Sequence, residues 1–115
     1  MITPLALLLS TTLALHDHAV PPTTDTLVVH THFYCDHCGE CGSCQPLLER
    51  ELQYTKGVKH LAFDLKSHTI TIGYDPRKAD PATLRKTIAA LGFAADDLTY
   101  DETGHKKLDA CCQKP

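Results

Sequence analysis

The part of the chain that folds is predicted to begin with a strand. Leu27, Val29 and Phe33 fall on one face of an alternating pattern, and this period of two is typical of a strand with one buried face. We place this strand at about Thr26 to Tyr34. Two further strands are marked by apolar positions, which are Val58, Leu61, Phe63 and Leu65 for one and Ile70, Ile72 and Tyr74 for the other. Residues 66–68 form the turn between them, and Phe63 and Tyr74 are expected in the core.

Two helices are predicted, one before and one after this pair of strands. In the first, Ser43 is expected to be the N-cap, Pro46 fits the first turn, and Leu48 and Leu52 share the buried face. Gly57 is expected to end it. The signals of the second helix are an N-cap with proline after it, a buried stripe and a terminal glycine, namely Asp80, Pro81, Leu84, Ile88, Leu91 and Gly92.

These elements predict an α+β domain with the ferredoxin-like βαββαβ fold. The order is strand, helix, strand, strand, helix, with a weak last strand near Ala95 to Tyr100. Two helices that each bury one stripe, and strands that alternate in polarity, are satisfied by a two-layer sandwich. It has an antiparallel sheet with both helices on one face. The loop between the first strand and the first helix then lies exposed at one edge of the sandwich.

Length and composition indicate one domain with additional terminal segments. The chain has 115 residues, of which 43% are hydrophobic, enough for one compact core. Leu5 to Leu15 is an apolar run with the length of a signal-peptide core and too short to span a bilayer. We therefore expect a signal peptide at 1–15, a linker at 16–26, the domain at 27–100 and a tail at 101–115. The mature domain is expected to be periplasmic or otherwise exported, without membrane insertion.

The charge distribution gives no reason to expect a nucleic acid partner. The formal net charge is -3, and the first 49 residues contain no Lys or Arg. The half of the chain with most of the cysteines is therefore anionic. Its carboxylates either form a rim that favours cations or are ordinary solvated surface groups.

A cysteine-rich loop carries the candidate chemistry. Cys35, Cys38, Cys41 and Cys44 form three overlapping C-x-x-C units, and Cys111-Cys112 adds a pair near the carboxyl end. A C-x-x-C unit that enters a helix can direct both sulfurs at one ion, and the helix N-terminus lowers the thiol pKa. Soft thiolates select ions such as Cu(I) and Zn(II) over Mg(II) or Ca(II).

From Leu27 to about Asp97 the chain resembles a heavy-metal-associated domain, the module of copper chaperones, metal-pumping ATPases and periplasmic mercuric-ion-binding proteins. The resemblance rests on C-G-S-C at 41–44, Leu52, Gly57-Val58, Tyr74-Asp75-Pro76 and the L-R-K-T-I-A-A-L-G-F helix end. It implies that Cys41 and Cys44 are metal ligands and that Phe93 packs near the metal loop. The chain departs from the family pattern at Gly39-Glu40, where the methionine that anchors the loop is absent.

The other cysteines leave several interpretations open. Cys111 and Cys112 are expected to approach the same metal site, because the tail is long enough to fold back, whereas the alternative is a disordered tail with oxidisable thiols. Cys35 and Cys38 are further ligands, part of a second thiolate site, or a disulfide, and we prefer the ligand interpretation.

The histidines are weaker candidates. His37 lies inside the loop, but we interpret it as facing solvent rather than binding metal. His30 and His32 share one strand face and are interpreted as exposed strand residues. His60, His68 and His105 are expected at the surface.

Three other functional classes were weighed. A thiol-disulfide oxidoreductase would use Cys41 and Cys44 as its redox pair, but the order of elements is not thioredoxin-like. An iron-sulfur protein needs a last cysteine interval one residue longer, and a structural zinc module needs a longer loop between its knuckles. We therefore expect a non-enzymatic protein that captures a soft ion and delivers it to a transporter or efflux component, or sequesters it. Cu(I) and Hg(II) are the favoured ions, with Zn(II) and Cd(II) as alternatives.

Overall fold

The computed structural model describes residues 23–35, 37, 39–40 and 42–115. The expected signal peptide, most of the expected linker, Cys38 and Cys41 lie outside the described residues. Among the described residues, none of the helices combines the length and the apolar character that a membrane crossing requires.

Three antiparallel strands form the sheet in the order β1-β3-β2. They are β1 (Asp25–His30), β2 (Val58–Asp64) and β3 (Thr69–Tyr74). Leu27 lies opposite Ile72, and Val29 lies opposite Ile70, and all four side chains are buried. The alternation in the sequence therefore identified the buried face of the sheet correctly.

The first strand is shorter than predicted, because it ends at His30 rather than near Tyr34. Beyond the end of β1, the backbone is held by His68 in the turn between β2 and β3. The N–H of Thr31 donates to the carbonyl oxygen of His68 at 2.9 Å, and the N–H of Phe33 donates to the Nδ1 atom of His68 at 2.9 Å. These bonds guide the chain from the sheet into the cysteine loop.

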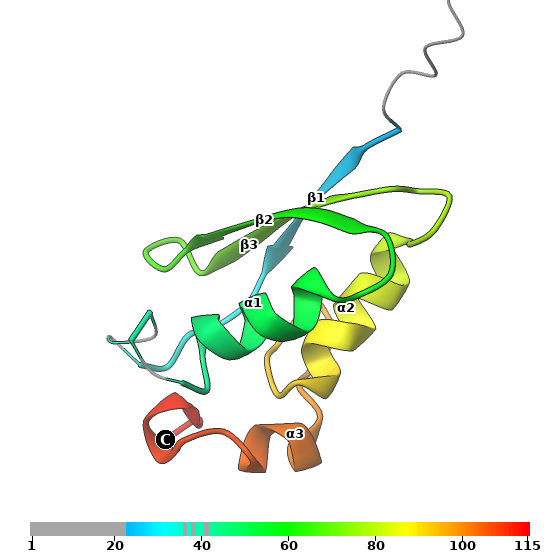
Figure 1. Cartoon of the computed structure of the whole chain (residues 1–115). Coiled ribbons are helices and arrows are strands. Elements are labelled where there is room, and N and C mark those ends of the chain that lie inside the picture. Colours follow the sequence, from blue (N-terminus) through cyan, green and yellow to red (C-terminus); the bar gives the residue numbers. More distant parts are fainter. Residues whose placement is uncertain (1–22, 36, 38, 41) are drawn as a thin grey trace, which may run out of the picture.

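Both long helices cover the same face of the sheet (Figure 1). They are α1 (Gln45–Gln53) and α2 (Pro81–Ala90). Leu48 and Leu52 of α1 and Leu84 and Ile88 of α2 are fully buried in the core that the helices share with the sheet. The ferredoxin-like fold class is therefore confirmed.

The two helix starts differ in how well the sequence predicted them. Asp80 is the N-cap of α2 as expected, since its Oδ1 atom accepts a hydrogen bond from the Thr83 N–H at 2.9 Å. The prediction of Ser43 as the cap of α1 was wrong. Cys44 is the N-cap, and the Ser43 hydroxyl instead accepts a hydrogen bond from the tail.

The weak last strand is not formed in the described part of the chain. Ala95 and Leu98 make only an isolated bridge, and Asp96 takes a φ of 53°. Its N–H donates to the His30 carbonyl oxygen at 2.7 Å, and its Oδ1 atom accepts from the His30 N–H at 2.9 Å. Burial raises the pKa of Asp96, but bonds from Arg85 and His30 outweigh it and hold the pKa below its usual range. Asp96 thus bonds to the backbone at the end of β1, where a fourth strand was expected to pair.

After this point the tail forms helical turns and returns to the domain. It contains α3 (Glu102–Lys106) and the 3-10 turn η1 (Ala110–Cys112). Asp101 is the N-cap of α3, and its backbone N–H donates to the Ala89 carbonyl oxygen at 2.8 Å. From there the tail runs beneath the two long helices toward the start of α1 (Figure 1).

Candidate metal centre

Cys44 begins helix α1 and has a fully buried side chain. Pro46 directly follows the first helical residue, where a missing N–H costs no helical hydrogen bond. The positive end of the helix dipole favours a thiolate at this position, whereas burial of the side chain opposes it.

Cys112 reaches the same point from the far end of the chain. Its side chain is 1% exposed, and its Sγ atom lies 2.6 Å from the Sγ atom of Cys44. The approach of the tail to the cysteine loop, which the sequence analysis expected, is thus present in the structure. The alternative of a disordered tail does not describe residues 101–115, which form α3 and η1.

Backbone and side-chain contacts fasten the tail on both sides of Cys112. Before it, the N–H of Asp109 donates to the Ser43 hydroxyl oxygen at 2.8 Å, and Leu108 is buried in the core. After it, the Gln113 amide donates to the Leu108 carbonyl oxygen at 2.9 Å. Cys112 is therefore part of a fitted segment and not of a loose end.

His105 is a structural residue that the sequence analysis wrongly expected at the surface. Its side chain is 5% exposed, and its ring stacks on Tyr100 with centroids 3.8 Å apart. The Nδ1 atom lies 2.8 Å from the Gly92 carbonyl oxygen, and the Nε2 atom accepts from the Lys114 N–H at 2.8 Å. Nothing in the local sequence predicts this burial, because both backbone partners depend on how the tail folds back.

The remaining described cysteines lie near this pair but differ in environment. Cys111 is exposed, and its Sγ atom lies 3.9 Å from that of Cys112. Cys35 is half-buried at the start of the loop, where its sulfur accepts a hydrogen bond from the His37 N–H at 3.3 Å. Cys38 and Cys41 lie outside the described residues, so their predicted ligand roles stay predictions.

Of the histidines, His30, His32, His37 and His60 are exposed, in agreement with the expectation for each. His68 is half-buried, because it bonds to the backbone of Phe33 and stacks with the His32 ring at 4.8 Å. His68 lies in the turn after β2 and has a left-handed φ of 55°. We therefore assign His68 to holding the chain that leads into the cysteine loop.

Phe93 lies in the core, beside the residues that lead into the cysteine loop. It is 3% exposed, and its ring contacts Phe33 edge-on with centroids 6.2 Å apart. Phe33 lies two positions before Cys35, so this aromatic pair forms the buried support at one end of the cysteine loop.

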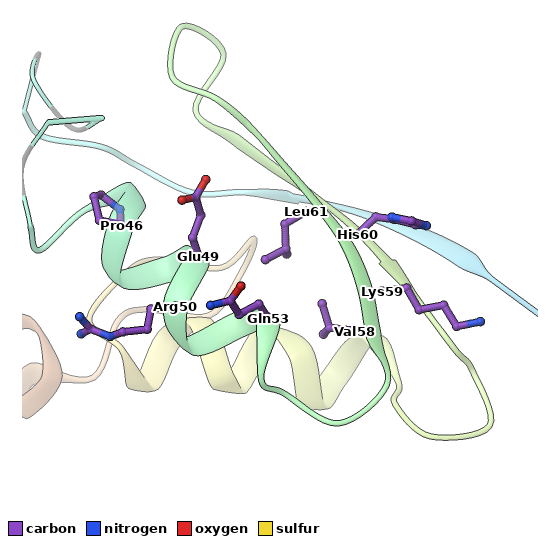
Figure 2. A pocket seen from close by; sticks show the side chains of 8 residues that line it. All are labelled: Pro46, Glu49, Arg50, Gln53, Val58, Lys59, His60 and Leu61. Atoms are coloured by element: carbon purple, nitrogen blue, oxygen red, sulfur yellow. The ribbon is translucent and has the colours of Figure 1, made fainter.

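The cysteine pair is separate from a groove on the surface of the sandwich. That groove has a volume of about 410 Å³ and lies between α1 and β2 (Figure 2). Its lining is largely polar and charged, and it consists of Pro46, Glu49, Arg50, Gln53, Val58, Lys59, His60 and Leu61. None of the described residues that line this groove is a cysteine.

Within the described residues, no three His, Cys, Asp or Glu side chains form a ready-made metal cluster. Between described residues, the sulfur of Cys112 lies 2.6 Å from that of Cys44 and 3.9 Å from that of Cys111. Sequence places Cys41 three positions before Cys44, in a unit whose spacing suits two thiolates on one ion. The donor set at this end of the molecule is therefore sulfur, which fits a thiophilic ion better than Mg(II) or Ca(II).

Comparison with known proteins finds a family match over part of the chain. Residues 40–94 match the heavy-metal-associated domain family. The chain is 32% identical over 69 residues to a zinc-transporting ATPase of Synechocystis sp., covering 58% of this chain and 10% of that protein. It is 36% identical over 55 residues to copper-transporting ATPase 1 of Mus musculus, covering 48% of this chain and 4% of that protein. The chain therefore spans only a small part of these relatives.

Two solved structures share the fold. Oxidized MerP from Ralstonia metallidurans CH34 superposes with a TM-score of 0.54 at 16% identity, over 64% of this chain and 94% of that one. The CopZ metallochaperone superposes with a TM-score of 0.52 at 18% identity, over 62% and 98%. Residues 40–94, which include the C-G-S-C motif, thus match the heavy-metal-associated domain family, and the fold of the chain is that of both solved structures.

Proposed function

We propose that this protein binds one thiophilic metal ion through the thiolates of Cys41 and Cys44. The observation that carries the proposal is the position of Cys44, whose sulfur lies at the start of α1 where it meets a second sulfur. Thiolates at a helix N-terminus are stabilised in the form that coordinates soft ions. The family match over residues 40–94 includes both cysteines of the motif.

The proposed role is to carry or sequester the ion rather than to catalyse a reaction. Two relatives are named as zinc-transporting and copper-transporting ATPases, and one structural neighbour is named as a metallochaperone. These names support a transporter as the partner that receives the ion. An ion held by few thiolates is handed over by stepwise exchange, in which partner cysteines bind before the original ones leave. The matches give no support to the oxidoreductase alternative.

We further propose that the protein works after export, because the run from Leu5 to Leu15 has the character of a signal-peptide core. Cu(I) and Hg(II) are the ions of choice, and Zn(II) and Cd(II) are the alternatives for the same sulfur donors. Fractionation of cells that express the full chain tests export, and mature protein found only in the cytoplasm would contradict it.

Anaerobic titration of the reduced protein tests the metal site. Cu(I), Hg(II), Zn(II) and Cd(II) are each added in competition with a chelator of known affinity. We expect one tightly bound soft ion in the wild type, and loss of tight binding in the Cys41→Ser/Cys44→Ser variant. A matched control is Ser67→Ala, which removes a hydroxyl in the exposed turn after β2 and no sulfur. Unchanged affinity and stoichiometry in the double cysteine variant would refute the proposal.

A further inference from the structure

We infer that Cys112 is a third sulfur ligand of the bound ion and that the tail is a closure that brings it to the site. This inference rests on the proposed function, since it concerns the ion held by Cys41 and Cys44. It begins with the placement of the two sulfurs that the structure describes, those of Cys44 and Cys112 at 2.6 Å.

The geometry favours Cys112 over its neighbour Cys111. The Cys112 side chain is 1% exposed and points at Cys44, whereas Cys111 is exposed. The turn η1 creates this difference, because a tight turn sends successive side chains in different directions. Among the contacts between described residues, Cys112 is the tail cysteine whose sulfur meets Cys44 at the start of α1.

Metal binding requires a small adjustment of the pair. Two thiolates that bind one ion through bonds of ~2.3 Å lie roughly 3.8 to 4.0 Å apart, depending on whether the site is tetrahedral or trigonal. The sulfurs must therefore separate by about 1 Å, which a modest rotation about the side-chain bonds provides. Both side chains are buried, so the ion is shielded from water and from competing ligands once the tail is in place.

The tail is held by hydrogen bonds, such as those from Asp109 N–H to Ser43 and from Lys114 N–H to His105, and by the buried side chains of Leu108 and Cys112. Each hydrogen bond contributes about 1 kcal/mol, and burial of the two side chains adds to this, so the closed tail is the stable state. Release of Cys112 would leave an ion with fewer sulfur ligands, ready for exchange with the thiolates of an acceptor.

Sulfur counting by X-ray absorption at the copper edge tests the inference on the full chain. With one Cu(I) per reduced protein, we expect three sulfur neighbours in the wild type and two in Cys112→Ser. Cys112→Ser should still bind one ion, but with affinity lowered by roughly tenfold or more. Cys111→Ser is the matched control, because it removes the adjacent thiol, and it should keep three sulfurs.

A second control identifies where a third sulfur comes from. Cys35→Ser/Cys38→Ser should also keep three neighbours, because the inference assigns the third sulfur to the tail. A wild-type site with two sulfurs would overturn the inference, and so would a third sulfur that persists in Cys112→Ser. If Cys112→Ser does not fold, the number of sulfur neighbours in the wild type and in Cys35→Ser/Cys38→Ser still tests the inference. Failure of the proposed function is distinct, since it appears as tight binding by Cys41→Ser/Cys44→Ser.

Discussion

The sulfur atoms of Cys44 and Cys112 lie 2.6 Å apart, although 68 positions separate the two residues in the chain. One sulfur is fixed by the start of α1, and the other is brought by a tail that is bound to the ends of both long helices. The short distance between the two sulfurs therefore depends on how the tail packs on the domain. Variants that loosen the tail should separate these sulfurs.

Oxidation should join Cys44 and Cys112. A disulfide bond is ~2.05 Å long, so the two sulfurs need to approach by only about 0.5 Å. With a small-molecule disulfide as the oxidant, the two thiols lose two protons and two electrons, and the oxidant is reduced to two thiols. Peptide mapping of the oxidised protein should find residues 44 and 112 linked, together with loss of metal binding.

The variant Cys111→Ser distinguishes a disulfide between Cys44 and Cys112 from one between Cys44 and Cys111. It should form the same cross-link, whereas Cys112→Ser should not link its tail to residue 44. Oxidised protein with bonds only among residues 35–44 would contradict this expectation.

Substitution of Ser43 should loosen the tail and leave the domain intact. Ser43→Ala removes the oxygen that accepts the Asp109 N–H, which should cost about 0.5–1.5 kcal/mol. Hydrogen exchange should become faster at residues 109–113 and stay unchanged in β3. Ser67→Ala is the control, because it removes a hydroxyl contact with Thr69 that lies in the exposed turn after β2. Equal effects of the two variants on the tail would argue against the role of Ser43.

Enlargement of Gly104 should displace the tail more strongly. A Cβ atom at this position would overlap the carbonyl oxygen of Ala90, which is backbone and cannot move aside cheaply. Gly104→Ala should therefore expose Cys112, and thiol alkylation of the folded protein should reach it much faster. Thr103→Ala is the control in the same helix, since residue 103 is exposed and alanine favours helix. Slow alkylation of Cys112 in Gly104→Ala would show that α3 is not held against α2 as described.

The stability of the folded protein at acid pH should depend on Asp75. Its side chain is 2% exposed, and hydrogen bonds from the Arg77 side chain and backbone lower the pKa of Asp75 from 3.8 to about 2. A carboxylate with a depressed pKa stabilises the folded state above its unfolded-state pKa, and this stability is lost as pH falls through the folded-state pKa. Stability should therefore decline from about pH 4 toward pH 2 through this group.

Asp75→Asn should remove that part of the pH dependence and also lower stability at neutral pH, because the charged partner of Arg77 is lost. Chemical denaturation at several pH values measures both effects. Asp97→Asn, at an exposed position, should leave the profile as it is in the wild type. A pH profile for Asp75→Asn that overlays the wild type would show that the Arg77 contact is not formed in solution.

The fold class followed from local patterns because each pattern records burial directly. Alternation at Leu27 and Val29 and the four-residue spacing of Leu48 and Leu52 mark the faces that meet in the core. The cap at Asp80 and the positive φ of Gly92 were likewise predictable, since each depends on a few neighbouring residues. The same holds for Cys44, which the C-G-S-C motif placed at the start of a helix.

Other features depended on contacts that the local sequence does not record. Asp96 bonds to the end of β1 in place of a fourth strand, and Ser43 bonds to the tail instead of capping α1. His105 looks like a surface residue until the backbone at Gly92 and Lys114 surrounds it.

The sequence by itself determined the sandwich, its buried faces and the sulfur character of the site, because periodicity and side-chain chemistry are local properties. Only the tertiary structure decided which of two adjacent tail cysteines meets Cys44, since that depends on the turn at residues 110–112 and on the docking of a segment more than sixty residues away in the chain.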